Sequence, residues 1–371
     1  MKQRIDQVVT YLQEHSIDAA LVNSPENFFY LTGFLTDPHE RLIGLLVFPD
    51  RKPIAVVPGM ETSQLKEAGW SGEVIGYADH ENPWKLMAGE MGEEFTADLK
   101  SVGIEKEVLS YGRSESFLAL FNEPEVKDIE GQLNEMRVVK DEEEISILKE
   151  AAELADVGVQ AGLDALKEGI TEMEVLARIE FELKKKGVPA MSFSTMVLFG
   201  EKSGQPHGNP GRRRLQDGDF VLFDLGVVWK GYTSDITRTF AYRSVSPKQK
   251  EIYETVLAAL EASLQICKPG TRIGDLDDAA RKVITDAGYG ELFPHRVGHG
   301  LGINVHEFPS MSHLNDGTLK EGMTFTIEPG IYDPSIGGVR LEEDVLITSE
   351  GYETLTKTSR QLKIIEKKPE S

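Results

Sequence analysis

Cysteine is nearly absent from this sequence, since Cys267 is the only one among 371 residues. No intrachain disulfide can therefore form, which excludes a disulfide-stabilised scaffold and fits a reducing compartment. The sequence also contains no run of 18 uncharged apolar residues, and its first residues, MKQRIDQVVTYLQEHS, carry charges through an amphipathic helical pattern. We therefore expect no membrane-spanning helix and no signal peptide, and we predict a cytoplasmic protein.

Positive charge is scarce as well, because 40 Lys and Arg residues stand against 62 Asp and Glu residues, a formal net charge of −22. A surface this negative repels nucleic-acid phosphates and anionic lipids, so we expect neither nucleic acid nor membrane as a partner. The hydrophobic fraction of 40% and the charged fraction of 27% are ordinary for a globular protein. The length exceeds that of a usual single domain, so we expect two domains.

Short apolar runs alternate with helical patterns over roughly the first 120 residues, which indicates a layered α/β domain. The predicted strands are Ala19–Val22, Ile43–Phe48, Ile54–Val57 and Val74–Tyr77, and helices are predicted at 60–68 and 83–99. This part shows no catalytic spacing, and we expect its His15, His39 and His80 to be surface or packing residues. The charged segment 122–134 contains Pro124 and is typical of a boundary, which predicts domains over residues 1–125 and 126–371.

The second domain shows signs of an internal duplication. Long helices are predicted at 142–166, 171–186 and 247–267, with apolar runs broken by glycines between them. The second of these helices starts at Thr171, with Glu174 three residues later, which is a capping signal. The resulting order of helices and strands repeats once along the chain, and this repetition hints at two similar halves.

A direct alignment of the two strand-rich pieces supports the duplication. GDFVLFDLG, which contains Asp224, matches GMTFTIEPG, which contains Glu328, at a shift of 104 residues. Each piece continues into a second strand, one beginning near Asp235 and the other near Glu342. We therefore predict two β-hairpins, each with one carboxylate per strand. Two such hairpins facing each other would bring four carboxylates together.

Four carboxylates in an apolar setting need positive charge. Burying each one costs several kcal/mol unless it finds a partner, and like charges repel each other. Arg238 and Arg340 could neutralise some of them as structural ion pairs, but two arginines do not easily serve four acids. Two divalent cations would resolve both problems, and metals about 3.5–4 Å apart can activate one shared water.

Histidines add to this set. The stretch HRVGHGLGINVHE, residues 295–307, holds three of them among small residues, which is unusual for a plain structural segment. One histidine with four carboxylates forms a hard donor set that suits manganese, cobalt or zinc. His207, in the loop GQPHGNP, is a weak signal alone, but it lies seventeen residues before Asp224.

The order Asp, Asp, His, Glu, Glu with separations of 11, 64, 29 and 14 residues resembles that of the pita-bread metallopeptidases, which include methionine aminopeptidase, aminopeptidase P and prolidase (Xaa-Pro dipeptidase). The blocks FDLG, TSDITRTF, GHGLGINVHE, TIEPGIY and GVRLEEDV look like those of this family. The stretches DAALVNSPENFFYLTGF and RVVKDEEEISILKEAA look like the accessory domain of the prolidase and aminopeptidase P branch and the start of its catalytic domain. The resemblance covers nearly the whole chain. It implies an α/β amino-terminal domain of the creatinase type before an α+β pita-bread (creatinase/aminopeptidase) domain with internal pseudo-duplication.

The resemblance also implies roles for residues of this chain. The implied ligands of two divalent ions are Asp224, Asp235, His299, Glu328 and Glu342, of which Asp235 and Glu342 would bridge. Glu328 also matches the family's proton acceptor, while His207 and His306 match its substrate-side histidines. His295 and Arg340 match positions on the prolyl side, where Arg340 would either hold the substrate carboxylate or orient a ligand. Asn304 and His313 depart from the family pattern or lack an assigned partner, which affects substrate preference more than reaction class.

We therefore predict a dinuclear-metal peptidase that hydrolyses the Xaa-Pro bond of dipeptides, with manganese as the metal and cobalt or zinc as alternatives. Its partner would be a small peptide, and the resemblance implies a homodimer. The main alternative is an Xaa-Pro aminopeptidase acting on longer peptides, but the short chain and compact amino-terminal domain favour the dipeptidase. Methionine aminopeptidase lacks such an amino-terminal domain. A metal-free binding protein or a creatinase-like hydrolase on the same fold would show substitutions among the five ligands, and this sequence shows none.

Overall fold

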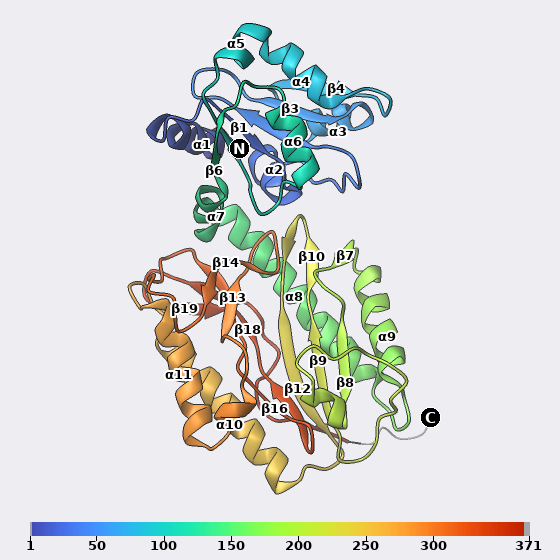
Figure 1. Ribbon diagram of the computed structural model, residues 1–371. Helices are drawn as coiled ribbons and strands as arrows, with labels where there is room; N and C mark the ends of the chain where they lie inside the picture. The colour runs from blue at the N-terminus through green and yellow to red at the C-terminus, as the bar shows by residue number, and fades with distance from the viewer. Residues whose placement is uncertain (1, 367–371) are drawn as a thin grey trace. The chain divides into compact units, whose positions relative to one another are not determined.

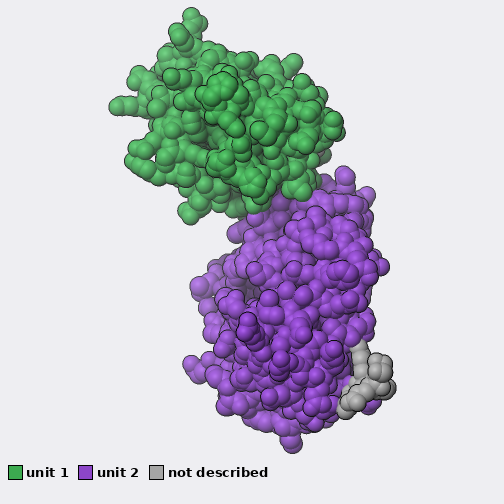
Figure 2. Space-filling model, turned by 90° about the vertical axis from the view of Figure 1, so that its right-hand side faces the viewer, with its two compact units in different colours: residues 1–136 green, residues 137–371 purple. Residues whose placement is uncertain are grey.

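The computed structural model describes residues 2–366 and divides the chain into two compact units, residues 1–136 and 137–371 (Figure 2). The first is called here the amino-terminal unit and the second the carboxy-terminal unit. Among the described residues, no helix combines the length and the apolar character that crossing a membrane requires.

The amino-terminal unit is built on one mixed sheet of six strands, in the order β4-β3-β2-β1-β5-β6. The strands are β1 (Ala19–Val22), β2 (Gly44–Val47), β3 (Ile54–Pro58), β4 (Glu73–Tyr77), β5 (Ser101–Ile104) and β6 (Glu125–Asp128). The helices of this part are α1 (Lys2–Glu14), α2 (Pro25–Thr32), η1 (Gly59–Glu61), α3 (Thr62–Glu67), α4 (Pro83–Met91), α5 (Glu93–Asp98), α6 (Tyr111–Leu118) and α7 (Glu130–Val138). The α/β character predicted from the sequence is confirmed, and the four predicted strands agree with β1 to β4 within one residue at each end.

Two predictions for this unit differ in detail from the structure. The helix predicted at 83–99 is divided into α4 and α5 because Gly92 between them adopts a left-handed φ of 88°, which an α-helix does not accommodate. The helix predicted at 60–68 begins with the 3-10 turn η1 before α3. β6 begins at Glu125 and pairs in parallel with β5, so the amino-terminal sheet continues beyond this point of the chain. His15, His39 and His80 are exposed, as expected for surface residues.

The carboxy-terminal unit contains two helix pairs, each packed on its own set of strands (Figure 1). The helices are α8 (Glu142–Ala165), α9 (Glu172–Lys185), α10 (Pro247–Gln265) and α11 (Ile273–Asp286), with the 3-10 turns η2 (Gly200–Gly204) and η3 (Gly290–Leu292). The first half uses β7 (Ala190–Met191), β8 (Met196–Phe199), β9 (Phe220–Leu225), β10 (Val227–Trp229), β11 (Tyr232–Thr233) and β12 (Ile236–Tyr242). The second uses β13 (Gly298–Gly300), β14 (Glu307–Met311), β15 (Thr324–Ile327), β16 (Gly330–Asp333), β17 (Gly337–Arg340), β18 (Glu343–Ile347) and β19 (Tyr352–Thr354), while β20 (Ile364–Ile365) joins β12. This arrangement confirms the predicted duplication.

Local signals place the helices close to the site strands. Asp141 and Glu144 form a capping box at the start of α8, and the predicted box of Thr171 and Glu174 starts α9. Two glycines of α8 face β9 directly: a Cβ on Gly158 would lie 2.9 Å from Leu225 Cδ1, and one on Gly162 would lie 2.7 Å from Phe223 Cε2. The absence of side chains at these two positions lets α8 lie against the strand that carries Asp224.

The two predicted hairpins place their carboxylates at equivalent positions. In the first, β9 pairs antiparallel with β12, so Asp224 lies opposite Thr237 and Asp235 immediately precedes β12. In the second, β15 pairs antiparallel with β18; Glu328 directly follows β15 and Glu342 directly precedes β18. Each half therefore presents one acid at the end of a strand and one at the start of the strand paired with it.

Gly226, two residues after Asp224, provides a test of this packing. A Cβ at this position would lie 1.8 Å from the carbonyl oxygen of Ser234, which no side-chain movement relieves. We expect Gly226→Ala to cost about 1–3 kcal/mol of unfolding free energy, as overpacking does. The corresponding fall in Tm is roughly 2–12 °C for a unit of this size, measured by calorimetry in the presence of chelator.

Gly351→Ala is the matched control, because a Cβ there would find its nearest neighbour, Cys267 O, at 3.9 Å. Its Tm should stay within about one degree of wild type. Equal Tm values for the two variants would contradict the close approach of the strands at Gly226.

Candidate metal centre

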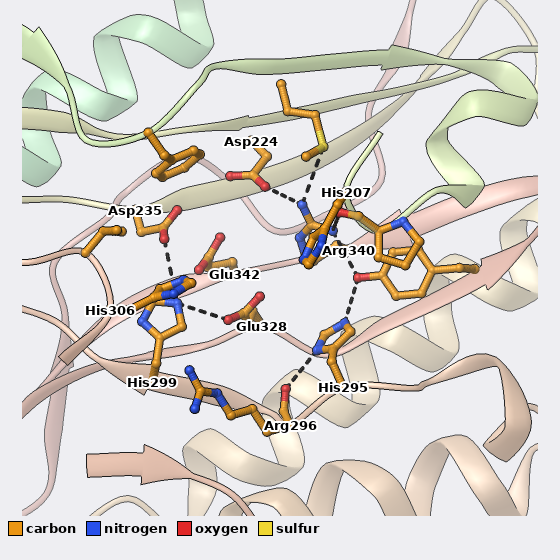
Figure 3. A pocket seen from close by; sticks show the side chains of 15 residues that line it. His207, Asp224, Asp235, His295, Arg296, His299, His306, Glu328, Arg340 and Glu342 are labelled. Atoms are coloured by element: carbon orange, nitrogen blue, oxygen red, sulfur yellow. Dashed lines mark hydrogen bonds and ion pairs between the residues drawn. The ribbon is translucent and has the colours of Figure 1, made fainter. Parts of the chain in front are cut away.

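The four predicted carboxylates converge in the carboxy-terminal unit, and three of them are almost completely buried. Asp224, Asp235 and Glu342 are 8%, 5% and 2% exposed, and Glu328 is partly buried beside them. Figure 3 shows the carboxylates of Asp235, Glu328 and Glu342 pointing toward the ring of His299. The hairpins thus bring all four acids to one place, as the sequence predicts.

His299 completes this cluster from β13. Its Nε2 lies 3.2 Å from Glu328 Oε1 and 3.8 Å from Asp235 Oδ2. One donor atom each from Asp235, His299 and Glu342 lie within 4.8 Å of one another. β13 can approach β15 this closely because a Cβ on Gly298 would lie 2.0 Å from Thr326 O. The glycine before His299 is therefore required by the packing of the site.

The surroundings shift the pKa values of the acids in opposite directions. Burial, with the charges of Glu342 and Asp224, raises the pKa of Asp235 well above its usual range. Burial, with the charges of Glu328 and Asp224, does the same to the pKa of Glu342. Burial also tends to raise the pKa of Glu328, but the hydrogen bond and charge of His299 outweigh it and lower this pKa to about 2. Ionising all four acids together requires additional positive charge.

The donor atoms fit divalent cations. Asp224 Oδ1, Asp235 Oδ1 and Glu342 Oε1 are buried and have no hydrogen-bond partner among the described residues, which is costly for a carboxylate. His299 Nδ1 lies 3.2 Å from the carbonyl oxygen of Gly300, to which it can donate a proton, so Nε2 faces the acids and can either donate to Glu328 or bind a metal ion. Two lone pairs 3.2 Å apart, on Nε2 and Glu328 Oε1, need a proton or a cation between them. A cluster of carboxylates with one imidazole is a donor set for hard or borderline divalent metals.

Arginines neutralise only one of the four acids. Arg238, 0% exposed, pairs with Glu343 at 2.7 Å and donates to the backbone carbonyl of Glu342, so its charge goes to a residue outside the set. Arg340 pairs with Asp224. In the described part of the chain no ion pair to lysine or arginine reaches Asp235, Glu328 or Glu342, so structural ion pairing does not account for the cluster.

The guanidinium of Arg340 is fully engaged with protein atoms. Nε donates to Thr237 Oγ1 at 3.0 Å, and one terminal nitrogen donates to Tyr332 Oη at 3.0 Å and Pro206 O at 3.3 Å. The other terminal nitrogen donates to Asp224 and lies 3.9 Å from the sulfur of Met196. A guanidinium has five N–H donors, and this arrangement uses all five.

Tyr332 links Arg340 to His295, and the hydrogen bonds define the protonation of that histidine. His295 Nδ1 lies 2.8 Å from the carbonyl oxygen of Arg296, an acceptor, so Nδ1 carries the proton. Burial lowers the pKa of His295, so the ring is neutral and Nε2 accepts the hydroxyl hydrogen of Tyr332 at 2.8 Å. Burial also raises the pKa of Tyr332 to about 12, which keeps that hydroxyl protonated.

His306 lies beside the acids, and His207 lies across the cavity from it (Figure 3). The ring centroids of His306 and His299 are 4.0 Å apart. Burial lowers the pKa of His306 to about 4, with a further contribution from His299, so the ring is neutral at physiological pH. A neutral imidazole has one N–H to donate to an oxygen of a bound substrate.

These residues surround a cavity of about 400 Å³. All nine site residues predicted from the sequence line it, so the structure brings together every side chain singled out for chemistry. The remaining lining residues were not predicted: Phe193, Met196, Pro206, Arg296, Val305 and Tyr332. Arg296 adjoins His295 and Tyr332 follows Glu328 by four residues, so proximity to the motifs could have indicated them. The apolar residues gave no comparable signal.

The two departures from the family pattern have partners. Asn304 accepts a hydrogen bond from Arg137, and its backbone nitrogen donates to Glu307 Oε1 at 3.0 Å. His313 lies outside the cavity with Nδ1 3.2 Å from Asp277 Oδ2. Both are explained by local packing in the carboxy-terminal unit.

Comparison with known proteins gives the same assignment for both parts of the chain. Residues 146–349 match the model of metallopeptidase family M24, and residues 4–139 match that of the creatinase/prolidase N-terminal domain. The chain is 56% identical over 362 residues to a putative dipeptidase, YkvY, of Bacillus subtilis (strain 168), covering 98% of this chain and 99% of that protein.

Two solved structures show the same two-part architecture. An Xaa-Pro dipeptidase from Bacillus anthracis superposes with a TM-score of 0.91 at 33% identity, covering 98% of this chain and 99% of that one. An X-Pro aminopeptidase from Thermotoga maritima MSB8 superposes with a TM-score of 0.87 at 30% identity, covering 98% and 100%. The fold predicted from the sequence is therefore confirmed, and the family match with the buried Asp, His and Glu cluster indicates divalent metal binding.

Asp235→Asn separates metal binding from folding. The amide keeps the shape of the side chain but removes one charge from a buried set of like charges. In chelator, we expect the variant to unfold at the same temperature as wild type or a few degrees higher. Addition of Mn²⁺ should raise the Tm of wild type, because ligand binding stabilises the folded state, and should raise that of the variant far less.

The control is Asp286→Asn, which removes an exposed acid paired with Lys282 on the surface of α11. It should respond to Mn²⁺ as wild type does. An Asp235→Asn protein that retains the full metal content and the full rise in Tm would remove Asp235 from the ligand set.

Proposed function

The chain belongs to metallopeptidase family M24, and on this basis we propose that it hydrolyses the Xaa-Pro bond of dipeptides, as a prolidase (Xaa-Pro dipeptidase) does. The observation that carries the proposal is that four carboxylates and four histidines surround one cavity of about 400 Å³. One of these histidines, His299, is a proposed metal ligand. A cavity of this size is in the range of small-molecule sites, roughly 300–1,000 Å³, and suits a small peptide.

The proposed metal site holds two divalent ions, and hard oxygen donors favour manganese over softer-ligand metals. The proposed ligands are Asp224, Asp235, His299, Glu328 and Glu342, with Asp235 and Glu342 bridging. Ions held there supply Lewis-acid charge that lowers the pKa of a water molecule and polarises a carbonyl.

The protein groups around the scissile bond have distinct proposed tasks. Glu328, which lines the cavity beside His299, accepts the proton released by the attacking water. His306 is neutral and donates its N–H to the oxygen that gains negative charge as the carbonyl is attacked. His207, on the other side of the cavity, holds the substrate carbonyl. The nitrogen that leaves belongs to proline and carries no hydrogen, so shape and the carbonyl contacts must recognise it.

For the prolyl end of the substrate we propose a partner other than Arg340 or His295. Every N–H of Arg340 is donated within the protein, so its proposed task is to orient Asp224 and Tyr332. A neutral His295 whose Nδ1–H is donated to Arg296 O likewise has no hydrogen to offer a carboxylate. Arg296 also lines the cavity and is exposed, with a hydrogen bond from Nη1 to Ser310 Oγ. We therefore propose that Arg296 attracts the free carboxylate of the dipeptide.

A second candidate function is Xaa-Pro aminopeptidase activity on longer peptides. The likeness to the Thermotoga maritima X-Pro aminopeptidase, at 30% identity over 98% of this chain, favours it. The two activities share the proposed chemistry and differ in whether the proline carries a free carboxylate or a further residue. The homodimer and the cytoplasmic location are further parts of the proposal.

A comparison of substrate lengths tests the proposal. We expect manganese-loaded protein to cleave Xaa-Pro dipeptides and to lose at least about tenfold in kcat/KM when the prolyl carboxylate is amidated or extended to Xaa-Pro-Yaa, because a cation loses its partner. In Arg296→Gln, the difference in kcat/KM between the dipeptide and the amidated or extended substrates should largely disappear, while the metal content stays unchanged.

Arg178→Gln, which removes an exposed guanidinium on α9, is the control and should behave as wild type. Equal or faster cleavage of tripeptides by wild type would support the aminopeptidase instead. Absence of Xaa-Pro cleavage at every length would reject both activities.

A further inference from the structure

The segment from Phe199 to Gly211 carries His207 but has little regular structure. It contains the short turn η2 and two backbone turns, Gln205 N to Lys202 O and Gly208 N to Gln205 O, both at 3.0 Å. The ring of His207 is exposed and makes no hydrogen bond to any residue that the structure describes. Its place at the cavity therefore depends on the backbone of this segment.

Glu172 holds both ends of the segment. It is the first residue of α9 and is 0% exposed, although an acid at a helix start usually faces solvent. Its Oε1 accepts a hydrogen bond from Phe199 N at 3.0 Å, and its Oε2 accepts one from Gly211 N at 2.8 Å. A single buried carboxylate thus joins two backbone positions that flank His207.

Lys202 links this carboxylate to the middle of the segment. Its Nζ forms an ion pair with Glu172 Oε2 and also donates to Asn209 O, two residues after His207, at 2.8 Å. Charge-assisted hydrogen bonds of this kind are stronger than neutral ones, and the Glu172 side chain is completely buried. His207 therefore lies between Phe199 and Gly211, the two residues whose backbone nitrogens are bound by Glu172.

The opposite side of the segment lies against the hairpin of β16 and β17. Gly338 N donates to Ser203 Oγ at 2.8 Å, and a Cβ on Gly338 would lie 2.1 Å from Ser203 O. Pro206 O, directly before His207, accepts a hydrogen bond from Arg340 Nη1 at 3.3 Å. Movement of the segment would therefore disturb His207 and one of the contacts of Arg340.

We propose that Glu172, with Lys202, is a positioning residue that fixes the Phe199–Gly211 segment so that His207 faces the substrate carbonyl. The inference rests on the role proposed for His207, but Glu172 and Lys202 are not among the residues that line the cavity. It explains why an acid is buried at the start of α9 and paired with a lysine from a loop.

A double-mutant cycle tests whether the anchor acts through His207. Lys202→Met removes the ion pair and the Asn209 contact while keeping the two backbone hydrogen bonds to Glu172. We expect it to lower kcat/KM for an Xaa-Pro dipeptide about tenfold, since small displacements of a positioned group are costly. In the His207→Ala background, the same change should have less than about a twofold effect, because coupled residues are not additive. Lys202→Arg, which keeps both donors, should restore most of the activity.

An activity-independent measurement separates this inference from the proposed function. The histidine ring signals are followed by NMR in metal-free protein, and that of His207 is identified by its loss in His207→Ala. Lys202→Met should shift or broaden this signal and leave that of His299 unchanged. The control Lys230→Met, which breaks an exposed pair with Glu150, should leave both unchanged.

Each outcome decides one question. An unmoved His207 signal in Lys202→Met, or an equal loss of kcat/KM with and without His207, overturns the positioning role. A moved signal in a protein that cleaves no Xaa-Pro peptide supports the positioning role and rejects the proposed function. A wild-type rate in His207→Ala rejects the role of His207 in catalysis and, with it, the inference.

Discussion

Four carboxyl groups share one buried space in this protein, and their mutual repulsion is the constraint on which the rest of the site depends. Asp224 has a guanidinium partner, but Asp235 and Glu342 have a pKa raised by burial and by their neighbours. Each of these three acids also has a buried oxygen with no donor among the described residues. Such a cluster is tolerable when cations join it, because the attraction of divalent charge offsets both desolvation and repulsion. The same cations would then provide the chemistry.

The proposed metal ligands lie mainly at strand ends, whereas the two histidines proposed to contact substrate lie in irregular segments. The four acids lie at strand ends in two hairpins that are related by the internal duplication, and each hairpin is covered by its own helix pair. His207 and His306 lie in irregular segments. Buried charged groups outside the ligand set hold these segments: Glu172 the first, and Glu307, paired with Arg137 and Lys140, the second. Under the proposed roles, the positions of both histidines would depend on salt bridges outside the ligand set.

Much of the fold and of the candidate site could be predicted from the sequence because both produce local sequence patterns. Period and capping signals identify α9 from Thr171 and Glu174, and the 104-residue shift relates Asp224 to Glu328. Fixed separations between ligand types then indicate the site. Helix termination at Gly92 was not predicted because the apolar pattern continues past it, although its left-handed backbone ends α4.

The parts that were not predicted depend on contacts between distant residues. The position of Arg340 in the sequence is compatible with binding substrate or with orienting a ligand. The structure shows that its N–H groups donate to residues such as Thr237 and Tyr332. Arg296 stands beside His295 in the sequence, but its exposure within the cavity wall is a property of the fold. Phe193 and Met196 form part of the apolar wall without any pattern of their own.

We expect two divalent cations to balance the buried carboxylates, and counting the ions bound per chain measures this. Protein stripped with chelator is titrated with Mn²⁺ by calorimetry, and the bound metal is counted by elemental analysis after removal of free ions. We expect two ions per chain, with a clear rise in Tm as they bind. Uptake of no ion, with unchanged stability, would contradict it, and a single ion at saturation would contradict the dinuclear arrangement.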